Sequence, residues 1–202
     1  MTTSAAHQRR GLATLMWLAL PLVVGGGAGW WYVRHELPYV NRSNFVSPLA
    51  LESLTVRHDA KGSGHFGAPR SGSRHHTGVD LLARVGDPVF AIRSGRVMAS
   101  RYHRGFGYFI EIDHGRGFSS LYAHLSRLDV RRGMRVRQGQ LIGAVGKSGN
   151  ARSRHVEAHL HFELQRKGQP IDPRSVSFFH ARIHDPVYDT PASQNLTASA
   201  TH

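Results

Sequence analysis

Residues 159–164 read HLHFEL, and this stretch indicates both the type of fold and the place of its chemistry. In an extended strand alternate residues share a face, so the three apolar residues point one way and His159, His161 and Glu163 point the other. A single histidine on a strand is usually an ordinary surface residue. Two in alternation, behind a continuous apolar face, indicate a metal-binding or catalytic role.

Short apolar runs separated by glycine precede this stretch. They are rich in β-branched, aromatic and aliphatic residues, and read PVFAI, GRVMASRY, GYFIEIDH, FSSLYAHL and QLIGAVG. Turn signals recur every 8–12 residues or so, which is typical of an antiparallel sandwich or open barrel, and no segment here has the 3.6-residue period of a helix. We therefore predict an all-β domain of short strands over residues 56–179.

Residues 121–125, LYAHL, contain a third histidine of interest. Strict alternation puts Tyr122 and His124 on one face and the three apolar residues on the other, so His124 is predicted on a polar face beside a tyrosine hydroxyl. Three roles remain open for Tyr122: a partner of the catalytic residues, a substrate contact or a packing residue.

Residues 75–80, HHTGVD, add a histidine and a carboxylate. Gly78 argues against a helix, but a loop that turns into a strand could bring His76 and Asp80 to one metal ion. His75 competes with His76, and the local pattern does not choose between them.

The ligand chemistry is that of a cysteine-free zinc site. The chain has no cysteine, which excludes disulfides and thiolate ligands and leaves imidazole and carboxylate as the zinc donors. Three protein ligands would leave one position for water, which is the arrangement of a hydrolytic site, whereas four would close the site. Because His159 and His161 could both reach one ion, spacing alone does not separate these two cases.

These motifs, in this order and followed by GQPIDP at 168–173, resemble the M23 family of zinc metallopeptidases, the lysostaphin or LytM-type endopeptidases, from about residue 64 to 173. The resemblance implies a Zn²⁺ cofactor and an endopeptidase that hydrolyses peptidoglycan cross-links or stem peptides. It also implies roles for five residues, with His76, Asp80 and His161 as zinc ligands and His124 and His159 as catalytic imidazoles.

Relatives that have lost such residues activate other hydrolases, so a noncatalytic regulator or wall-binding module is the alternative function. None of the five residues is substituted here. One position departs from the family pattern: some relatives that cut glycine bridges carry a tyrosine six residues before the first ligand, where this chain has Arg70. A glycyl-glycine specificity is therefore less favoured.

The N-terminal region predicts export. Residues 11–33 carry no charge and match the roughly 20 residues that cross a bilayer, and Arg9 and Arg10 before them favour a cytoplasmic N-terminus. We predict a cytoplasmic segment 1–10 and a transmembrane signal anchor 11–33; a cleaved signal peptide and a buried helix are the alternatives. The catalytic domain would then lie on the outer face of the membrane of a bacterial cell envelope.

The remaining segments and the charge complete this prediction. Residues 34–55 are predicted to form a tether that could include one packed segment, and residues 180–202 a disordered tail. The net charge of +13 favours polyanionic surroundings such as an acidic cell wall. No continuous Lys/Arg block or nucleic-acid-binding motif is present, so the predicted partners are peptidoglycan, the membrane and a wall-assembly or regulatory protein, and not nucleic acid.

Overall fold

The structure is a computed structural model of the chain that describes residues 39, 41, 44–187 and 189. Within this part the architecture is mostly β with antiparallel pairing in the main sheet, as predicted. The described residues include no helix with the length and apolar character needed to cross a membrane. The predicted anchor, residues 11–33, lies outside them.

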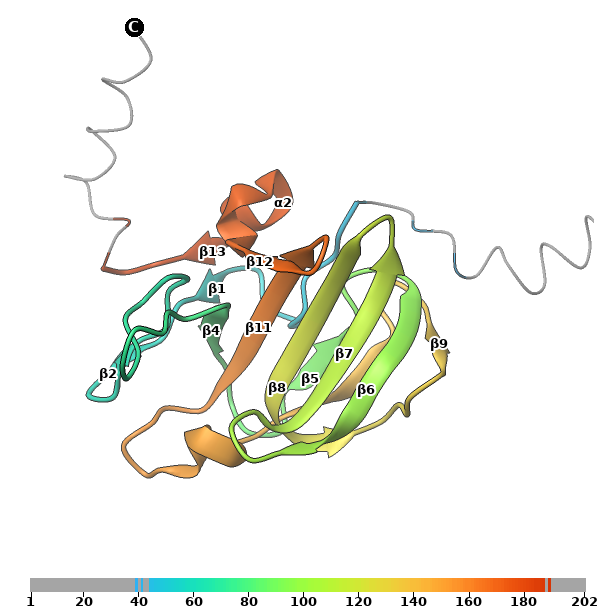
Figure 1. Cartoon of the computed structure of the whole chain (residues 1–202). Coiled ribbons are helices and arrows are strands. Elements are labelled where there is room, and N and C mark those ends of the chain that lie inside the picture. The colour runs from blue at the N-terminus through green and yellow to red at the C-terminus, as the bar shows by residue number, and fades with distance from the viewer. Residues whose placement is uncertain (1–38, 40, 42–43, 188, 190–202) are drawn as a thin grey trace, which may run out of the picture. The chain divides into compact units, whose positions relative to one another are not determined.

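Thirteen strands and three short helical turns make up the described fold (Figure 1). The strands are β1 (Leu54–Thr55), β2 (His58–Asp59), β3 (Gly62–Ser63), β4 (Val79–Leu82), β5 (Pro88–Phe90), β6 (Gly95–His103), β7 (Gly107–Gly115), β8 (Phe118–Leu128), β9 (Arg135–Val136), β10 (Leu141–Val145), β11 (His159–Arg166), β12 (Gln169–Ile171) and β13 (Ile183–His184). The helical turns are η2 (Gly149–Arg152), η3 (Pro173–Ser175) and α2 (Ser177–His180).

Strand β11 is central to the main sheet. It pairs with β8 along one edge and with β4 and then β12 along the other, and the sheet continues from β8 through β7 and β6 to β9. Figure 1 shows β11, β8, β7 and β6 side by side. Leu160, Phe162 and Leu164 of β11 are fully buried in the main core, which confirms the predicted apolar face of residues 159–164.

The packed region is wider than predicted at both ends. Phe45 and Leu54, from the predicted tether 34–55, are buried in the core, and Ile183, from the predicted tail 180–202, is buried with them. β1 and β13 form a parallel pair in which Leu54 lies opposite Ile183. A pairing between segments so far apart in the chain leaves no local periodicity, so the predicted limits were too narrow.

A row of hydrogen-bonded polar side chains is buried in the core, and two of its members, Ser120 and Tyr122, belong to β8. The hydroxyl of Ser120 lies 2.7 Å from Nε2 of His114 and 2.9 Å from the hydroxyl of Tyr122, and Nδ1 of His114 donates to the carbonyl of Ser94. The backbone N–H of Ile92 donates to the Tyr122 hydroxyl. Tyr122 is therefore a packing residue with a satisfied hydroxyl, and His114 is buried with it.

This burial makes the stability of the fold sensitive to acid. Burial lowers the pKa of His114 from 6.5 to about 4, so the folded protein binds this proton only at lower pH than the unfolded chain does. Stability should then decrease as pH falls from about 6.5 to about 4, by a total of about 3 kcal/mol from this residue. Denaturant unfolding of the protein and of His114→Gln at pH 7 and pH 4 measures it: the advantage of the unmodified protein should shrink by that amount. Parallel pH profiles of the two proteins would contradict the prediction.

Candidate active site

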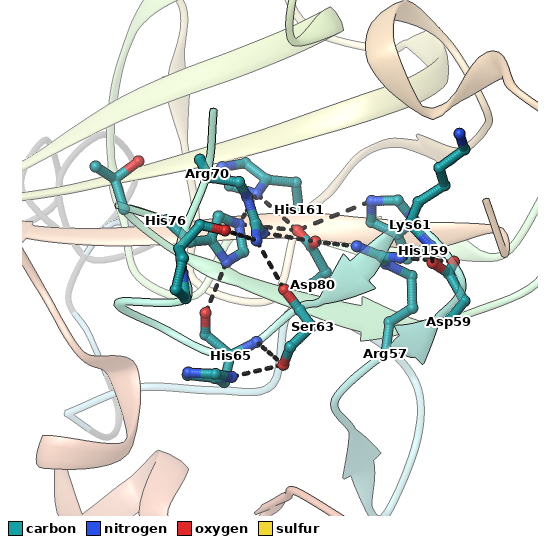
Figure 2. A network of polar contacts seen from close by, with 12 residues as sticks. Arg57, Asp59, Lys61, Ser63, His65, Arg70, His76, Asp80, His159 and His161 are labelled. Carbon is teal, nitrogen blue, oxygen red and sulfur yellow. Dashed lines mark hydrogen bonds and ion pairs between the residues drawn. The ribbon is translucent and has the colours of Figure 1, made fainter. Parts of the chain in front are cut away.

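Three donor atoms meet at one point above β4 and β11. Asp80 and His161 are directly opposite each other in the antiparallel pair of these strands, and so share a face. His161 Nδ1 lies 2.8 Å from Asp80 Oδ1 and 3.0 Å from His76 Nε2, and the last two atoms are 3.1 Å apart (Figure 2). All three residues are buried.

His76 reaches this point from the loop that leads into β4. The loop passes so close to β11 that a Cβ atom on Gly78 would come within 2.5 Å of the Phe162 carbonyl oxygen. A residue without a side chain is therefore required there. This close approach brings His76 over the strand that carries His161, while His75 remains exposed with its Nδ1 near the Gly67 carbonyl. The structure thus separates the two histidines that the sequence did not.

The far side of each imidazole in the donor set has a hydrogen-bond acceptor. His76 Nδ1 donates to the His65 carbonyl at 2.8 Å, and His161 Nε2 donates to Glu163 Oε1 at 3.1 Å. Thr77 in turn donates to the same Glu163 oxygen. Because these acceptors hold one ring proton each, His76 Nε2 and His161 Nδ1 can present lone pairs to a cation.

The donor set fits zinc. Zinc bonds of 2.0–2.1 Å in a tetrahedral site place neighbouring donors roughly 3.3 Å apart. The three donors lie 2.8–3.1 Å apart, so an opening of a few tenths of an ångström would suffice. Two imidazoles and one carboxylate are also donors that zinc accepts.

Two further imidazoles border the same point. The rings of His124 and His159 are 4.9 Å apart, and the His124 ring is 5.8 Å from that of His161. His124 Nδ1 donates to the Ser148 carbonyl and His159 Nδ1 to the Glu157 carbonyl, while His159 Nε2 lies 3.8 Å from Asp80 Oδ1. Because both Nδ1 atoms carry the proton, Nε2 of each neutral ring is a proton acceptor.

Burial keeps these two rings neutral. Burial, and then the neighbouring histidines, lower the pKa of His124 to about 3, and burial also lowers the pKa of His159. In His161 burial opposes the charged form too, but the Asp80 and Glu163 carboxylates outweigh it and raise the pKa to about 9 in the metal-free protein. A cation that binds at His161 therefore displaces a proton at neutral pH.

The predicted placement of His124 on the same face as Tyr122 is wrong. Tyr122 lies opposite Phe162 and points into the core, whereas His124 turns to the face of His159 and His161. The reason is a left-handed backbone at His124, with φ of 62°, beside irregular registers of β8 with β7 and β10. Such a residue interrupts the two-residue alternation of a strand.

Comparisons with known proteins point to one protein family. The profile described as Peptidase family M23 matches residues 74–173, which contain all five side chains. The DD-carboxypeptidase/endopeptidase Mpg of Neisseria meningitidis is 40% identical over 104 residues, which are 52% of this chain and 23% of that protein. The peptidoglycan DD-endopeptidase ShyC of Vibrio cholerae is 35% identical over 125 residues, which are 62% of this chain and 25% of that protein. The chain belongs to peptidase family M23.

A solved structure extends the likeness of this M23 domain to its fold. A chain in the crystal structure of the SpoIIIAH and SpoIIQ complex superposes with a TM-score of 0.53 at 25% identity, covering 65% of this chain and 99% of that one. The chain spans about a quarter of the length of the two curated relatives named above.

The M23 site also contains charged residues that the motifs did not predict. Asp80 Oδ2, the oxygen turned away from His76, lies 2.9 Å from Arg57 Nη2 and 3.6 Å from Arg70 Nη2. Burial favours the neutral carboxyl, but hydrogen bonds from His161 and His76 outweigh it and keep the pKa of Asp80 well below its usual range. The Asp80 carboxylate is thus held ionised, with the two imidazoles near Oδ1 and the two arginines near Oδ2.

Glu163 should strengthen metal binding through His161. Glu163→Gln keeps the shape but removes the charge that orients the His161 ring, and loss of such a partner weakens metal affinity by about 10- to 100-fold. A zinc titration against a competing chelator measures this loss. Glu111→Gln is the matched control, because Glu111 lies two strands away on the same face, across Leu121 of β8. Equal affinities of the two variants would contradict the role of Glu163.

Proposed function

We propose that this protein is a zinc-dependent endopeptidase that hydrolyses peptide bonds in peptidoglycan cross-links or stem peptides. One observation carries the proposal: three zinc-type donors and two neutral imidazoles, His124 and His159, border the same point. The names of the curated relatives Mpg and ShyC support a peptidoglycan peptide as the substrate.

In this proposal His76 Nε2, Asp80 Oδ1 and His161 Nδ1 hold the metal. A zinc ion there would supply Lewis-acid activation of a water molecule and of the scissile carbonyl. Glu163 and the His65 carbonyl fix the rings of the two histidine ligands. Three of the five side chains then bind the metal, and the other two, His124 and His159, are left for proton transfer.

His124 and His159 move the proton. Their Nδ1 protons are held by backbone carbonyls, so each ring can accept the proton of the attacking water only at Nε2. The ring that has taken this proton can deliver it to the nitrogen of the leaving amine. The other ring borders the same point, where its Nε2 can orient the water or, once protonated, donate to the developing oxyanion. The lowered pKa values keep Nε2 of both rings unprotonated at neutral pH.

We further propose that residues 11–33 anchor the protein in the bacterial plasma membrane, with the peptidase domain on the outer face. The uncharged segment and the preceding Arg9 and Arg10 support this orientation. Peptidoglycan lies on that side of the membrane, and the net charge of +13 suits an anionic envelope.

A noncatalytic role in an envelope assembly is the second candidate. The similarity to a chain of the SpoIIIAH and SpoIIQ complex favours it, because that structure is a complex between proteins. The five intact site residues favour the enzyme.

Digestion of defined, cross-linked muropeptides distinguishes these candidates. The purified protein is incubated with them in the presence of zinc or of a chelator, and the products are analysed by mass spectrometry. The peptidase proposal predicts new amino termini only with zinc, and the masses identify the bond that is cut. A zinc-loaded protein that leaves every muropeptide intact would refute it in favour of the noncatalytic role.

A further inference from the structure

Two arginines flank Asp80, but their charges are balanced differently. Arg57 is buried, with a side chain only 6% exposed, and forms ion pairs with both Asp59, at 2.6 Å, and Asp80, at 2.9 Å. Two carboxylates surround this one guanidinium. Arg57 is therefore fully neutralised and has the character of a structural residue.

Arg70 is placed differently. Its side chain is 28% exposed, and its Nη2 lies 3.6 Å from Asp80 Oδ2, beyond direct hydrogen-bond distance. Its Nη1 donates to the carbonyls of Ser63 and Pro69, which have no net charge. Figure 2 shows the Arg70 side chain ending between His76 and Asp80. Nη2 forms only this long ion pair with Asp80, and among the described residues neither Nε nor Nη2 of Arg70 has a hydrogen-bond acceptor, so both groups remain available to an anion from solvent.

The position and fixation of Arg70 suit recognition of a carboxylate. The two backbone carbonyls hold the guanidinium in one orientation before any ligand arrives, which reduces the entropy lost on binding. A planar guanidinium with an open edge pairs with a carboxylate through two parallel hydrogen bonds. His159 Nε2 lies 3.8 Å from Asp80 Oδ1, whereas Arg70 Nη2 lies 3.6 Å from Oδ2, so the two groups approach different oxygens of the same carboxylate.

A peptide substrate can carry a carboxylate close enough to the scissile bond to reach such a site. When the residue after the scissile bond is a chain terminus, or is linked onward through its side chain, its α-carboxylate is free and lies next to the bond that breaks. In a linear glycine bridge this group is itself an amide. We infer that Arg70 binds the free α-carboxylate of the residue that follows the scissile bond, and so selects peptides that carry this group. The inference rests on the proposed function and narrows its substrate class.

The test compares two pairs of ligands that differ only at this group. For turnover the pair is N-acetyl-D-alanyl-D-alanine and its C-terminal amide, assayed with the zinc-loaded protein. For binding the pair is the acid and the amide of the same dipeptide with the scissile CO–NH replaced by CH₂–NH, measured by calorimetry. The variants are Arg70→Gln and the control Arg74→Gln. Arg74 lies in the same loop and is exposed, and its side chain hydrogen-bonds only the Ser71 carbonyl among the described residues; its backbone carbonyl, which accepts from the Arg70 N–H, is unchanged by the substitution.

We expect the acid to bind about 10- to 100-fold more tightly than the amide, as for a hydrogen-bonded charge pair, and to be hydrolysed with a correspondingly higher kcat/KM. Arg70→Gln should remove this preference by weakening the acid alone, with zinc content unchanged, and Arg74→Gln should retain it. The acid–amide comparison on the unmodified protein holds whether or not a variant folds.

Several results would overturn the inference. Equal binding of acid and amide to the unmodified protein is the simplest. An Arg70→Gln variant that weakens both ligands equally, or loses zinc, would assign Arg70 a role in positioning Asp80 instead. A protein that prefers the acid in binding but hydrolyses neither peptide would refute the proposed catalysis and leave carboxylate recognition standing.

Discussion

Replacing His159 or His124 with alanine should reduce turnover of a peptidoglycan peptide by about 10²- to 10⁴-fold, the usual contribution of an acid–base residue, while zinc remains bound. His159 Nε2 lies 3.8 Å from Asp80 Oδ1, the His124 ring lies 5.8 Å from that of His161, and neither imidazole is one of the three donors. The decrease should fall on kcat, because these residues handle the proton during the reaction. Single-turnover rates and zinc content, measured on the same samples, test both parts of the prediction.

His155→Ala is the matched control for His159→Ala. His155 lies four positions earlier in the chain, is exposed, and contacts only Arg154 and Ser153 among the described residues. Its removal should change neither zinc content nor rate. Loss of zinc in His159→Ala would show that this residue is a ligand. The site would then have four protein ligands, and the proposed division between ligands and imidazoles would be wrong.

The strands of the domain could be predicted because burial of one face of a strand makes apolar residues recur at every second position in the sequence. Residues 159–164 alternate between apolar and polar, and β11 follows that alternation, with its apolar side in the core. The same alternation places His159, His161 and Glu163 together. The regular part of the site therefore follows from local pattern alone.

His124 shows where that pattern stops being informative. The direction of the His124 side chain depends on its own left-handed backbone, with φ of 62°. The residue type does not predict this conformation. The backbone N–H of His124 donates to the Phe106 carbonyl, and its ring donates to the Ser148 carbonyl. Both acceptors come from loops distant in sequence, so only the assembled fold turns this side chain toward the site.

The charges behind Asp80 could not be predicted either. Arg57 is 23 positions from Asp80 in the chain and is one of 26 lysines and arginines. No motif relates it to the histidines. Its contact arises because the segment just before β2 runs antiparallel beside β4, where the backbone N–H of Arg57 donates to the Asp80 carbonyl. Charge pairing of this kind is a product of the fold.

Asp80 is both a proposed metal ligand and the ion-pair partner of Arg57, whereas His76 is a proposed metal ligand without an arginine partner. Asp80→Ala and His76→Ala should each abolish stoichiometric zinc binding, because each removes one of three donors. In the metal-free state their effects on stability should differ. His76→Ala loses the hydrogen bond to the His65 carbonyl and the contact with Asp80 Oδ1, which together cost about 1–2 kcal/mol, but it leaves no buried charge without a partner. Asp80→Ala breaks a buried ion pair and leaves Arg57 with a single carboxylate, which should cost about 3 kcal/mol.

Denaturant unfolding in excess chelator measures this difference, since no zinc then contributes to the stability of any sample. Asp80→Ala should unfold at a clearly lower denaturant concentration than His76→Ala, and both should be zinc-free by elemental analysis. The double variant Arg57→Met/Asp80→Ala removes the stranded charge together with one of its two partners, while the other, Asp59, keeps hydrogen bonds from the backbone N–H groups of Lys61 and Glu157. It should recover part of the loss without recovering zinc, because replacing both members of a buried ion pair with apolar groups is less costly than removing one. If Asp80→Ala and His76→Ala unfolded at the same concentration, the arginine side of Asp80 would contribute nothing to the fold.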